Sequence, residues 1–276
     1  MIKFSVVMAV YQGDASEHVL DAIDSVLRQT IAPSELLIVV DGPVNDKLDA
    51  VLSNASNFDT VRIIKTPRNN GPGASRHLAI SEAKFDVIAI MDADDICLSN
   101  RFERQLPILE SGKADVVGAW VEEFDNNLGD LGRVRRVPVN HEQIFEYGKW
   151  RQPLNHVTAM FRKEAYHKAG GYQPIRYVED YDLIVRMLRK GIRFSNVPEV
   201  LVYVRTGKDM LSRRSGIPYL AAELHLFHRM YLVGYLNLFQ LFLNLLIRLV
   251  SRLLPRRFLS VVYDKWLRHY NRELTR

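Results

Sequence analysis

Four short apolar runs, each ending in polar residues, dominate the first hundred residues of the chain. The runs are KFSVVMAV (residues 3–10), SELLIVV (34–40), TVRIIK (60–65) and DVIAIM (86–91). Residues 18–30, after the first run, carry apolar side chains at helical spacing, and a helix is also predicted after NNGPG. Continuous apolar runs are typical of parallel strands that are buried on both faces. The sequence therefore predicts an α/β fold with a mostly parallel central sheet flanked by helices.

Polar residues follow each of the four runs. VYQGD follows the first, Asp41 the second and RNNGPG the third, and the fourth ends in Asp92, Asp94 and Asp95. Ligands of open parallel sheets bind at the carboxyl ends of the strands, so these four segments predict one crevice. Carboxylates this close resist ionising together, which indicates a bound divalent cation. The alternative is a polar loop whose aspartates cap the next helix.

The alternation becomes less regular beyond residue 114. The patterns predict strands at 114–125 and 194–205, a strand and a helix within 156–172, and a helix over 178–191. A basic loop and a short helix are predicted within 133–150. No linker rich in Gly, Ser or Pro marks a domain boundary before about Thr206.

The composition excludes several classes of protein. With 47% hydrophobic and 25% charged residues, the chain is predicted to be a folded globular enzyme and not a disordered protein. Its one cysteine, Cys97, excludes an intrachain disulfide, and we find neither a zinc-ligand spacing nor a secretory signal. We therefore expect the globular part to lie in the cytoplasm.

The positive charge is concentrated at one end of the chain. The formal net charge is +5, but residues 248–276 alone carry eight Lys/Arg against two acidic residues. The rest of the chain is therefore close to neutral, and its basic end predicts contact with an anionic surface. Because the residues before this end are apolar, a membrane is favoured over nucleic acid.

An apolar segment, residues 230–247, precedes the basic end and contains 18 residues without a formal charge. Three amides interrupt it at helical spacing, and two arginines continue the same stripe: Asn237, Gln240, Asn244, Arg248 and Arg252. A polar stripe opposite an apolar face favours a helix that lies in the membrane interface, with its arginines at anionic headgroups. The alternatives are a transmembrane span, for which the length suffices, and a buried or dimerising helix.

Five motifs in a fixed order make the chain similar to a known family. AVYQG, the Asp41 that ends the second strand, NNGPGASRH, MDADD and EDYDL together resemble the family 2 glycosyltransferases of GT-A fold, in particular those that build bacterial surface polysaccharides and O-antigens. The resemblance covers about residues 3–205. It implies a domain over 1–205, with a nucleotide-sugar half (1–100) and an acceptor half (101–205), followed by a membrane-associating tail over 206–276.

The resemblance implies a UDP-sugar as donor and Mn²⁺ or Mg²⁺ as cofactor. A cation held by carboxylates would neutralise the charge on the leaving diphosphate. The family pattern assigns Asp94 to the metal and Asp92 to the metal or the ribose, while Asp95 fixes the loop or contacts the donor sugar. It also aims Asp41 at the uracil N3–H and Arg76 at the diphosphate. The implied nucleotide-sugar residues are Val10, Tyr11, Asp41, Asn69, Gly71, Arg76, Asp92 and Asp95.

The resemblance also implies a catalytic pair in VEDYDL. Asp180 would take the proton of the acceptor hydroxyl, and Glu179 would orient the acceptor. Asp182 is a rival base, and all three carboxylates also suit a helix N-terminus. His156 is a further candidate for the acceptor site, although a lone histidine is more often structural.

The implied reaction is the inverting transfer of one sugar to a lipid-linked saccharide at the cytoplasmic face of the membrane. RMLRKG departs from the tryptophan motif of processive members, which argues against polymerisation. Two other functions fit parts of the pattern less well. A haloacid-dehalogenase-like phosphatase would use Asp92 and Asp94, but Ile96 stands where its motif has Thr or Val. A catalytically inactive nucleotide-sugar-binding membrane protein would not need both the base and the metal ligands.

Overall fold

The structure is a computed structural model that describes residues 2–206 and 216–253. In the first part of the chain, strands and helices alternate, and all four predicted strands are confirmed. The elements are β1 (Phe4–Tyr11), α1 (Ser16–Leu27), β2 (Glu35–Asp41), α2 (Asp46–Ala55), β3 (Val61–Lys65), α3 (Pro72–Glu82) and β4 (Val87–Asp92). The strands are parallel in the order β3-β2-β1-β4. Their register sets Tyr11 beside Asp41 and Ala9 beside Asp92, so the polar strand ends are neighbours.

The second part of the chain extends the sheet with strands of both directions. Its elements are β5 (Ile96–Cys97), α4 (Arg101–Glu110), β6 (Val116–Phe124), β7 (Arg133–Arg135), α5 (His141–Tyr147), the 3₁₀ turn η1 (His156–Thr158), β8 (Met160–Arg162), α6 (Lys163–Lys168), α7 (Glu179–Arg189) and β9 (Phe194–Arg205). The sheet continues from β4 as β8-β6-β9-β5, with β8 antiparallel to both of its neighbours. The sheet is therefore parallel in the half formed by β1–β4 and mixed in the other half.

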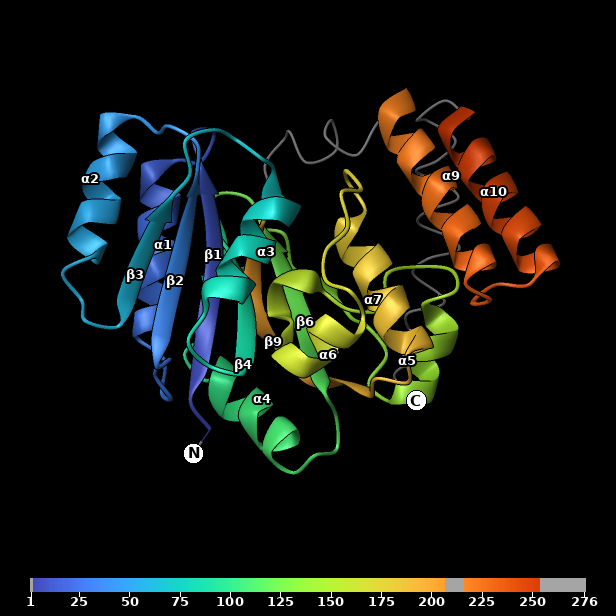
Figure 1. Ribbon diagram of the computed structural model, residues 1–276, viewed down its shortest axis with the longest axis horizontal. Helices are drawn as coiled ribbons and strands as arrows, with labels where there is room; N and C mark the ends of the chain where they lie inside the picture. Colours follow the sequence, from blue (N-terminus) through green and yellow to red (C-terminus); the bar gives the residue numbers. More distant parts are fainter. Residues whose placement is uncertain (1, 207–215, 254–276) are drawn as a thin grey trace.

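Helices cover both faces of the sheet (Figure 1). On one face, α1, α2 and α4 pack against alternate strand residues such as Val6, Met8 and Val10. On the other face, α3, α6 and α7 pack against the intervening residues, for example Val7 and Leu37. Two apolar layers on one sheet explain why the strands read as continuous apolar runs.

A helical hairpin of α9 (Ile217–Leu232) and α10 (Leu238–Leu253) lies beside α7 at one edge of the molecule (Figure 1). The predicted single helix over 230–247 is therefore wrong. Gly234, with φ of 68°, ends the first helix, and Asn237 and Gln240 begin the second by exchanging hydrogen bonds between side chain and backbone N–H (2.8 and 3.0 Å). None of the helices in the described residues is long and apolar enough to cross a membrane.

Two residues of the polar stripe of α10, Asn244 and Arg248, face the protein. Asn244 is 2% exposed, and its Nδ2 donates to the carbonyl of Lys149 (3.1 Å). Arg248 donates from Nη2 to the carbonyl of Trp150 (2.9 Å) and lies 3.5 Å from Glu223. The prediction that Arg248 meets lipid headgroups is therefore wrong, because its guanidinium is used within the fold. The predicted basic residues from Arg256 onward lie outside the described residues, and the division at residue 205 stays a prediction.

Candidate functional site

A cavity of about 310 Å³ opens at the carboxyl ends of β1 and β2. Three of the residues predicted to bind nucleotide-sugar line it, namely Tyr11, Asp41 and Asn69. Gln12, Gly13, Gly42 and Pro43 complete the lining. Val10 does not contribute its side chain, which is fully buried in the core, so only its backbone is available to a ligand.

The ring of Tyr11 forms one wall of this cavity and lies directly over Gly13. Tyr11 is 40% exposed, and a Cβ atom added to Gly13 would stand 2.4 Å from its hydroxyl oxygen. The backbone N–H of Tyr11 donates to Asp14 (2.9 Å), which closes the turn after β1. The glycine therefore allows an aromatic ring to lie flat at the cavity, where a base could stack on it.

Asp41 joins the end of β2 to the loop before α3. Its two carboxylate oxygens accept from the backbone N–H groups of Asn70 and Gly71, both at 2.8 Å. Gly71 has φ of 89° and begins α3, so a side chain at this position would be strained. Each oxygen of a carboxylate has a second lone-pair site, so Asp41 can still accept from a ligand. The carboxylate thus shapes the cavity as well as lining it.

Arg76 bridges the ends of α3, β4 and α7. One of its terminal nitrogens lies 2.6 Å from Asp92, and the other lies 3.7 Å from Glu179. Burial is the largest single influence and opposes ionisation of both partners, but the opposite charges and hydrogen bonds around each group together outweigh it. As a result, the pKa of Arg76 is raised and the pKa of Asp92 is held below its ordinary value. The structure therefore brings together three of the predicted site residues.

Glu179 lies in the same cluster but differs in its electrostatics. Burial, followed by the negative charge of Asp180, raises the pKa of Glu179 above its ordinary value. Gly73 lies against it, since a Cβ atom added to Gly73 would be 3.4 Å from Cγ of Glu179. A carboxyl group with a raised pKa in a site is poised to exchange hydrogen bonds with a polar ligand.

The Asp92–Asp95 loop has an excess of negative charge. Burial, then the charges of Asp94 and Asp92, raise the pKa of Asp95 well above its ordinary value. Asp95 accepts from the backbone N–H of Arg205 at 2.8 Å, so it anchors the loop to β9. Of its two predicted roles, the structure shows the fixing of the loop.

The carboxylates of this loop fit a hard divalent cation. Oxygen ligands suit Mg²⁺ and Mn²⁺, and a cation would relieve the repulsion that raises the pKa of Asp95. The described residues contain no group of three His, Cys, Asp or Glu side chains placed to hold a metal. A site of one or two carboxylates is the arrangement in which Mg²⁺ is completed by substrate phosphates and water. Asp94 and Asp92 would supply those carboxylates.

A fully buried arginine supports the same loop from below. Arg101 donates to the carbonyl of Ile90 (2.9 Å) and to Gln105 (3.0 Å), and it lies 3.2 Å from the sulfur of Cys97. Burial raises the pKa of Asp92, and the charge of Arg101 helps to lower it, after the larger lowering influences of Arg76 and His156. Burial raises the pKa of the Cys97 thiol. Arg101 therefore contacts the chain on both sides of the loop, at Ile90 before it and at Cys97 after it.

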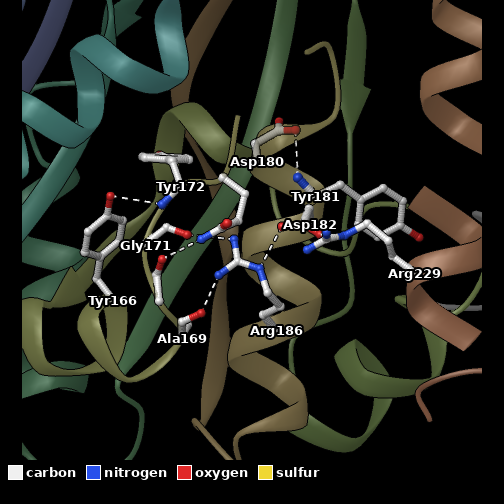
Figure 2. A network of polar contacts seen from close by, with 11 residues as sticks. Tyr166, Ala169, Gly171, Tyr172, Asp180, Tyr181, Asp182, Arg186 and Arg229 are labelled. Carbon is white, nitrogen blue, oxygen red and sulfur yellow. Dashed lines mark hydrogen bonds and ion pairs between the residues drawn. The ribbon is translucent and has the colours of Figure 1, made fainter. Parts of the chain in front are cut away.

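Asp180 and Asp182 begin α7 but have different surroundings (Figure 2). Asp180 accepts from the side-chain amide of Gln152 (2.8 Å) and from the backbone N–H of Tyr181 (2.7 Å). No cation pairs with it among the described residues at salt-bridge distance. Its carboxylate is thus oriented by neutral donors, which suits a group that takes up a proton.

Asp182 is instead neutralised by two arginines. Arg186 lies 2.7 Å from one carboxylate oxygen and Arg229, from α9, lies 3.0 Å from the other. Arg186 also donates to the carbonyls of Ala169 and Gly171, so it ties the loop after α6 to α7 (Figure 2). Asp182 is 3% exposed. This arrangement indicates a structural role for the rival base.

His156 belongs to a chain of hydrogen-bonded rings behind Asp92 and Asp180. Its Nε2 lies 2.6 Å from the hydroxyl of Tyr172, and the hydroxyl of Tyr166 accepts from the backbone N–H of Tyr172 (3.0 Å). Burial, followed by the charge of Arg76, lowers the pKa of His156 below 6.5. This histidine and its tyrosine partner therefore lie near the predicted catalytic group. Their position is compatible both with a structural role and with a contact to the acceptor.

Comparison with known proteins identifies the family. The model of Glycosyl transferase family 2 matches residues 5–170. The chain belongs to this family. The family 2 assignment agrees with the resemblance drawn from the motifs, and it overturns the phosphatase alternative.

Relatives of this family 2 glycosyltransferase cover almost its whole length. It is 33% identical over 97% of its residues to the Escherichia coli UDP-Gal:alpha-D-GlcNAc-diphosphoundecaprenol beta-1,3-galactosyltransferase, covering 98% of that protein. It is 34% identical over 95% of its residues to the amylovoran biosynthesis glycosyltransferase AmsE of Erwinia amylovora, again covering 98% of the relative. The solved structure of S. aureus TarS 1–349 with UDP-GlcNAc matches at a TM-score of 0.65 and 14% identity, over 83% of this chain and 66% of that one. That likeness confirms the α/β fold of GT-A type.

Several residues of the glycosyltransferase site were not found from the sequence. Gln152 and Tyr172 lie in stretches without a motif, and only the folded chain brings them to Asp180 and His156. Gly13 could have been noticed, because it stands in the VYQGD motif. Its role, which is to leave room for the ring of Tyr11, depends on the rotamer of that tyrosine. Tyr177 was also missed. It has φ of 73°, which is rare for a bulky residue, and it lies just before the start of α7.

Proposed function

We propose that this protein is an inverting, metal-dependent glycosyltransferase that moves one sugar from UDP to a lipid-linked saccharide at the cytoplasmic face of a membrane. One observation carries the proposal. The cavity lined by Tyr11 and Asp41 lies at the carboxyl ends of β1 and β2. The next strand, β4, ends beside β1 in Asp92, which pairs with Arg76, and Arg76 lies 3.7 Å from Glu179, the residue before Asp180. Nucleotide contacts, phosphate contacts and a proton acceptor therefore follow one another along one edge of the sheet.

The chemistry assigned to the chain's own residues is a direct displacement. Tyr11 and Asp41 hold the uracil, and Arg76 and the loop at Gly71 approach the diphosphate. Asp180 takes the proton of the acceptor hydroxyl while its oxygen bonds to the anomeric carbon. The bond from that carbon to the phosphate oxygen breaks at the same time, and its electron pair leaves with UDP. A bound Mg²⁺ or Mn²⁺ would stabilise the charge of the leaving diphosphate.

Two features support the assignment of Asp180 over Asp182 as base. The carboxylate of Asp180 forms no ion pair with the described residues and faces Gln152, whereas Asp182 already balances Arg186 and Arg229. Transfer of a proton to Asp182 would also leave two partly buried arginines without a counter-charge, which is costly. Displacement at one face of the sugar by an acceptor held at Asp180 inverts the anomeric centre.

The name of the Escherichia coli relative indicates which substrates to assay first. UDP-galactose is the first donor, and a synthetic GlcNAc-diphosphate-lipid is the first acceptor. A panel of other UDP-sugars follows, because a few hydroxyl contacts decide between sugars.

The test measures UDP release with and without acceptor, and the product linkage by NMR coupling constants. We expect acceptor-dependent release and a β-linked product from an α-linked donor. An α-linked product would contradict direct displacement. Binding of UDP-sugar with no transfer to any acceptor would favour the inactive binding protein.

A further inference from the structure

The outer face of α10 is formed by large apolar side chains. Leu238, Phe239 and Phe242 are 67%, 70% and 62% exposed, and Leu246, Leu249 and Val250 are each 44–45% exposed. Their spacing of three and four residues places them on one side of the helix. Single exposed apolar residues are ordinary, but a continuous row of this kind marks an interaction surface. We call these six residues the outer face of α10.

The contacts of the opposite side fix the direction in which this face points. Asn244 is hydrogen-bonded to Lys149, and Arg248 is bonded to Trp150 and paired with Glu223. Rotating the helix to bury its apolar residues would break these contacts and leave buried polar groups unpaired. The exposure of the outer face is therefore a property of the fold. α10 is therefore amphipathic, but its polar side packs on the protein and its apolar side is exposed, which is the opposite of an ordinary surface helix.

The charge of the adjoining sequence decides which partner fits the outer face. Residues 254–276, which follow α10, contain six Lys/Arg and two acidic residues. A second copy of the chain would add a further six Lys/Arg and two acidic residues of this kind to one assembly, and like charges repel. An anionic bilayer attracts the same segment while its hydrocarbon takes up the leucine and phenylalanine side chains.

The hairpin is attached to the helix that carries the proposed base. Arg229 of α9 pairs with Asp182, and Tyr219 of α9 packs against Tyr177 with ring centroids 5.9 Å apart. The residues that α10 holds, Lys149 and Trp150, lie just before Gln152, which is bonded to Asp180. α10 itself would therefore stand between a bilayer on the outer face and the acceptor side of the proposed site. This step alone rests on the proposed function.

We propose that the outer face of α10 docks this protein on an anionic lipid bilayer. Because apolar burial and charge attraction act together, binding should be strong only when anionic lipid and the apolar side chains are both present. Salt should weaken binding without abolishing it, since it screens charge over about 8 Å at physiological ionic strength and leaves apolar burial intact.

The test is flotation of the full-length protein with vesicles of phosphatidylcholine alone or mixed with phosphatidylglycerol. We expect binding to the mixed vesicles and little to the neutral ones. Changing Phe239→Gln and Phe242→Gln together should weaken binding by more than about tenfold. The matched control is Leu20→Gln with Phe58→Gln, which alters two exposed apolar side chains (48% and 54%) on α1 and in the turn after α2, helices that lie far from α10 (Figure 1). The control should bind as the wild type does.

The outcomes separate bilayer docking from a protein interface. Equal binding to both kinds of vesicle, or no binding to either, would overturn the proposal. A dimer in lipid-free solution that the Phe239 and Phe242 changes dissociate would assign the face to a second copy. Sugar transfer to a short-chain soluble acceptor, measured in parallel, tests the proposed function separately. If the wild-type protein transfers sugar but does not float with mixed vesicles, docking alone is refuted, and if it floats but transfers no sugar, the proposed function alone is refuted.

Discussion

Two neighbouring carboxylates of α7 should give opposite effects when each is changed to asparagine. Asp182→Asn removes the charge that balances Arg186 and Arg229 at 2.7 and 3.0 Å, whereas Asp180→Asn leaves an oxygen to accept from Gln152. We therefore expect Asp182→Asn to lower the free energy of unfolding and Asp180→Asn to lower turnover. The two substitutions are chemically identical and two residues apart, so each is the control for the other.

The expected size of the stability loss follows from the burial of the three side chains. Removing one member of a buried ion pair costs about 3–5 kcal/mol. The side chains of Asp182 and Arg186 are 4% and 14% exposed, but that of Arg229 is 35% exposed, so water compensates part of its loss. We expect the low end of the range, about 3 kcal/mol. For Asp180→Asn, loss of a general base predicts a decrease of about 10²–10⁴-fold in kcat with an unfolding free energy unchanged within about 0.5 kcal/mol.

Urea unfolding and a transfer assay together measure this prediction. With a urea m-value of about 3 kcal/mol/M, Asp182→Asn should move the unfolding midpoint down by about 1 M. Turnover should be measured well below that midpoint, so that the folded fraction is the same for both variants. If Asp182→Asn retains full stability and loses turnover while Asp180→Asn keeps its turnover, the assignment is refuted, because Asp182 would then be the base.

Three further predictions concern the metal, the cavity wall and pH. Chelation with EDTA should abolish transfer and Mn²⁺ should restore it to the wild type but not to a folded Asp94→Ala variant; activity that survives chelation would contradict the metal. Gly13→Ala should push the Tyr11 ring away, since the new Cβ would stand 2.4 Å from its hydroxyl, and calorimetry should show about tenfold weaker UDP binding with an unchanged urea midpoint. Burial and Arg76 lower the pKa of His156 in the folded state, so the unfolded state binds a proton more readily and stability should fall as pH drops below 6.5. Urea unfolding from pH 8 to 5 should show a smaller loss of stability for His156→Gln than for the wild type. An unaltered dependence of stability on pH in this variant would contradict the role of His156.

The strands and the order of the site could be predicted because they are local properties of the sequence. Each parallel strand is a continuous apolar run, and its polar end contributes directly to the crevice, as Asp41 and Asp92 do. The sequence did not predict α2 (Asp46–Ala55), which is short and carries only three large apolar side chains, nor the place of β8. Three residues, Met160–Arg162, carry no signal of their direction, and their antiparallel pairing with β4 is set by the packing of the whole second half.

The site was predictable where motifs supply it and hidden where distant segments meet. Asp180 follows from EDYDL, but its partner Gln152 is 28 residues away in a loop without a motif. The polar stripe of α10 shows a different failure. Periodicity correctly indicates that Asn244 and Arg248 share a side of the helix, and it indicates nothing more. Which side faces the protein depends on the carbonyl groups of Lys149 and Trp150, which no pattern in α10 reveals.

The position of Cys97 allows its labelling rate to report local opening next to the Asp92–Asp95 loop. It is the one cysteine in 276 residues, it is 5% exposed, and it ends the short strand that follows the Asp92–Asp95 loop. A thiol reagent can reach its sulfur only when this part of the loop separates from Arg101, so the labelling rate of the native protein measures the free energy of that local opening. A donor nucleotide that binds the closed loop should slow labelling in proportion to its occupancy. Kinetics of a single natural thiol would thus follow donor binding without any acceptor, membrane or engineered probe.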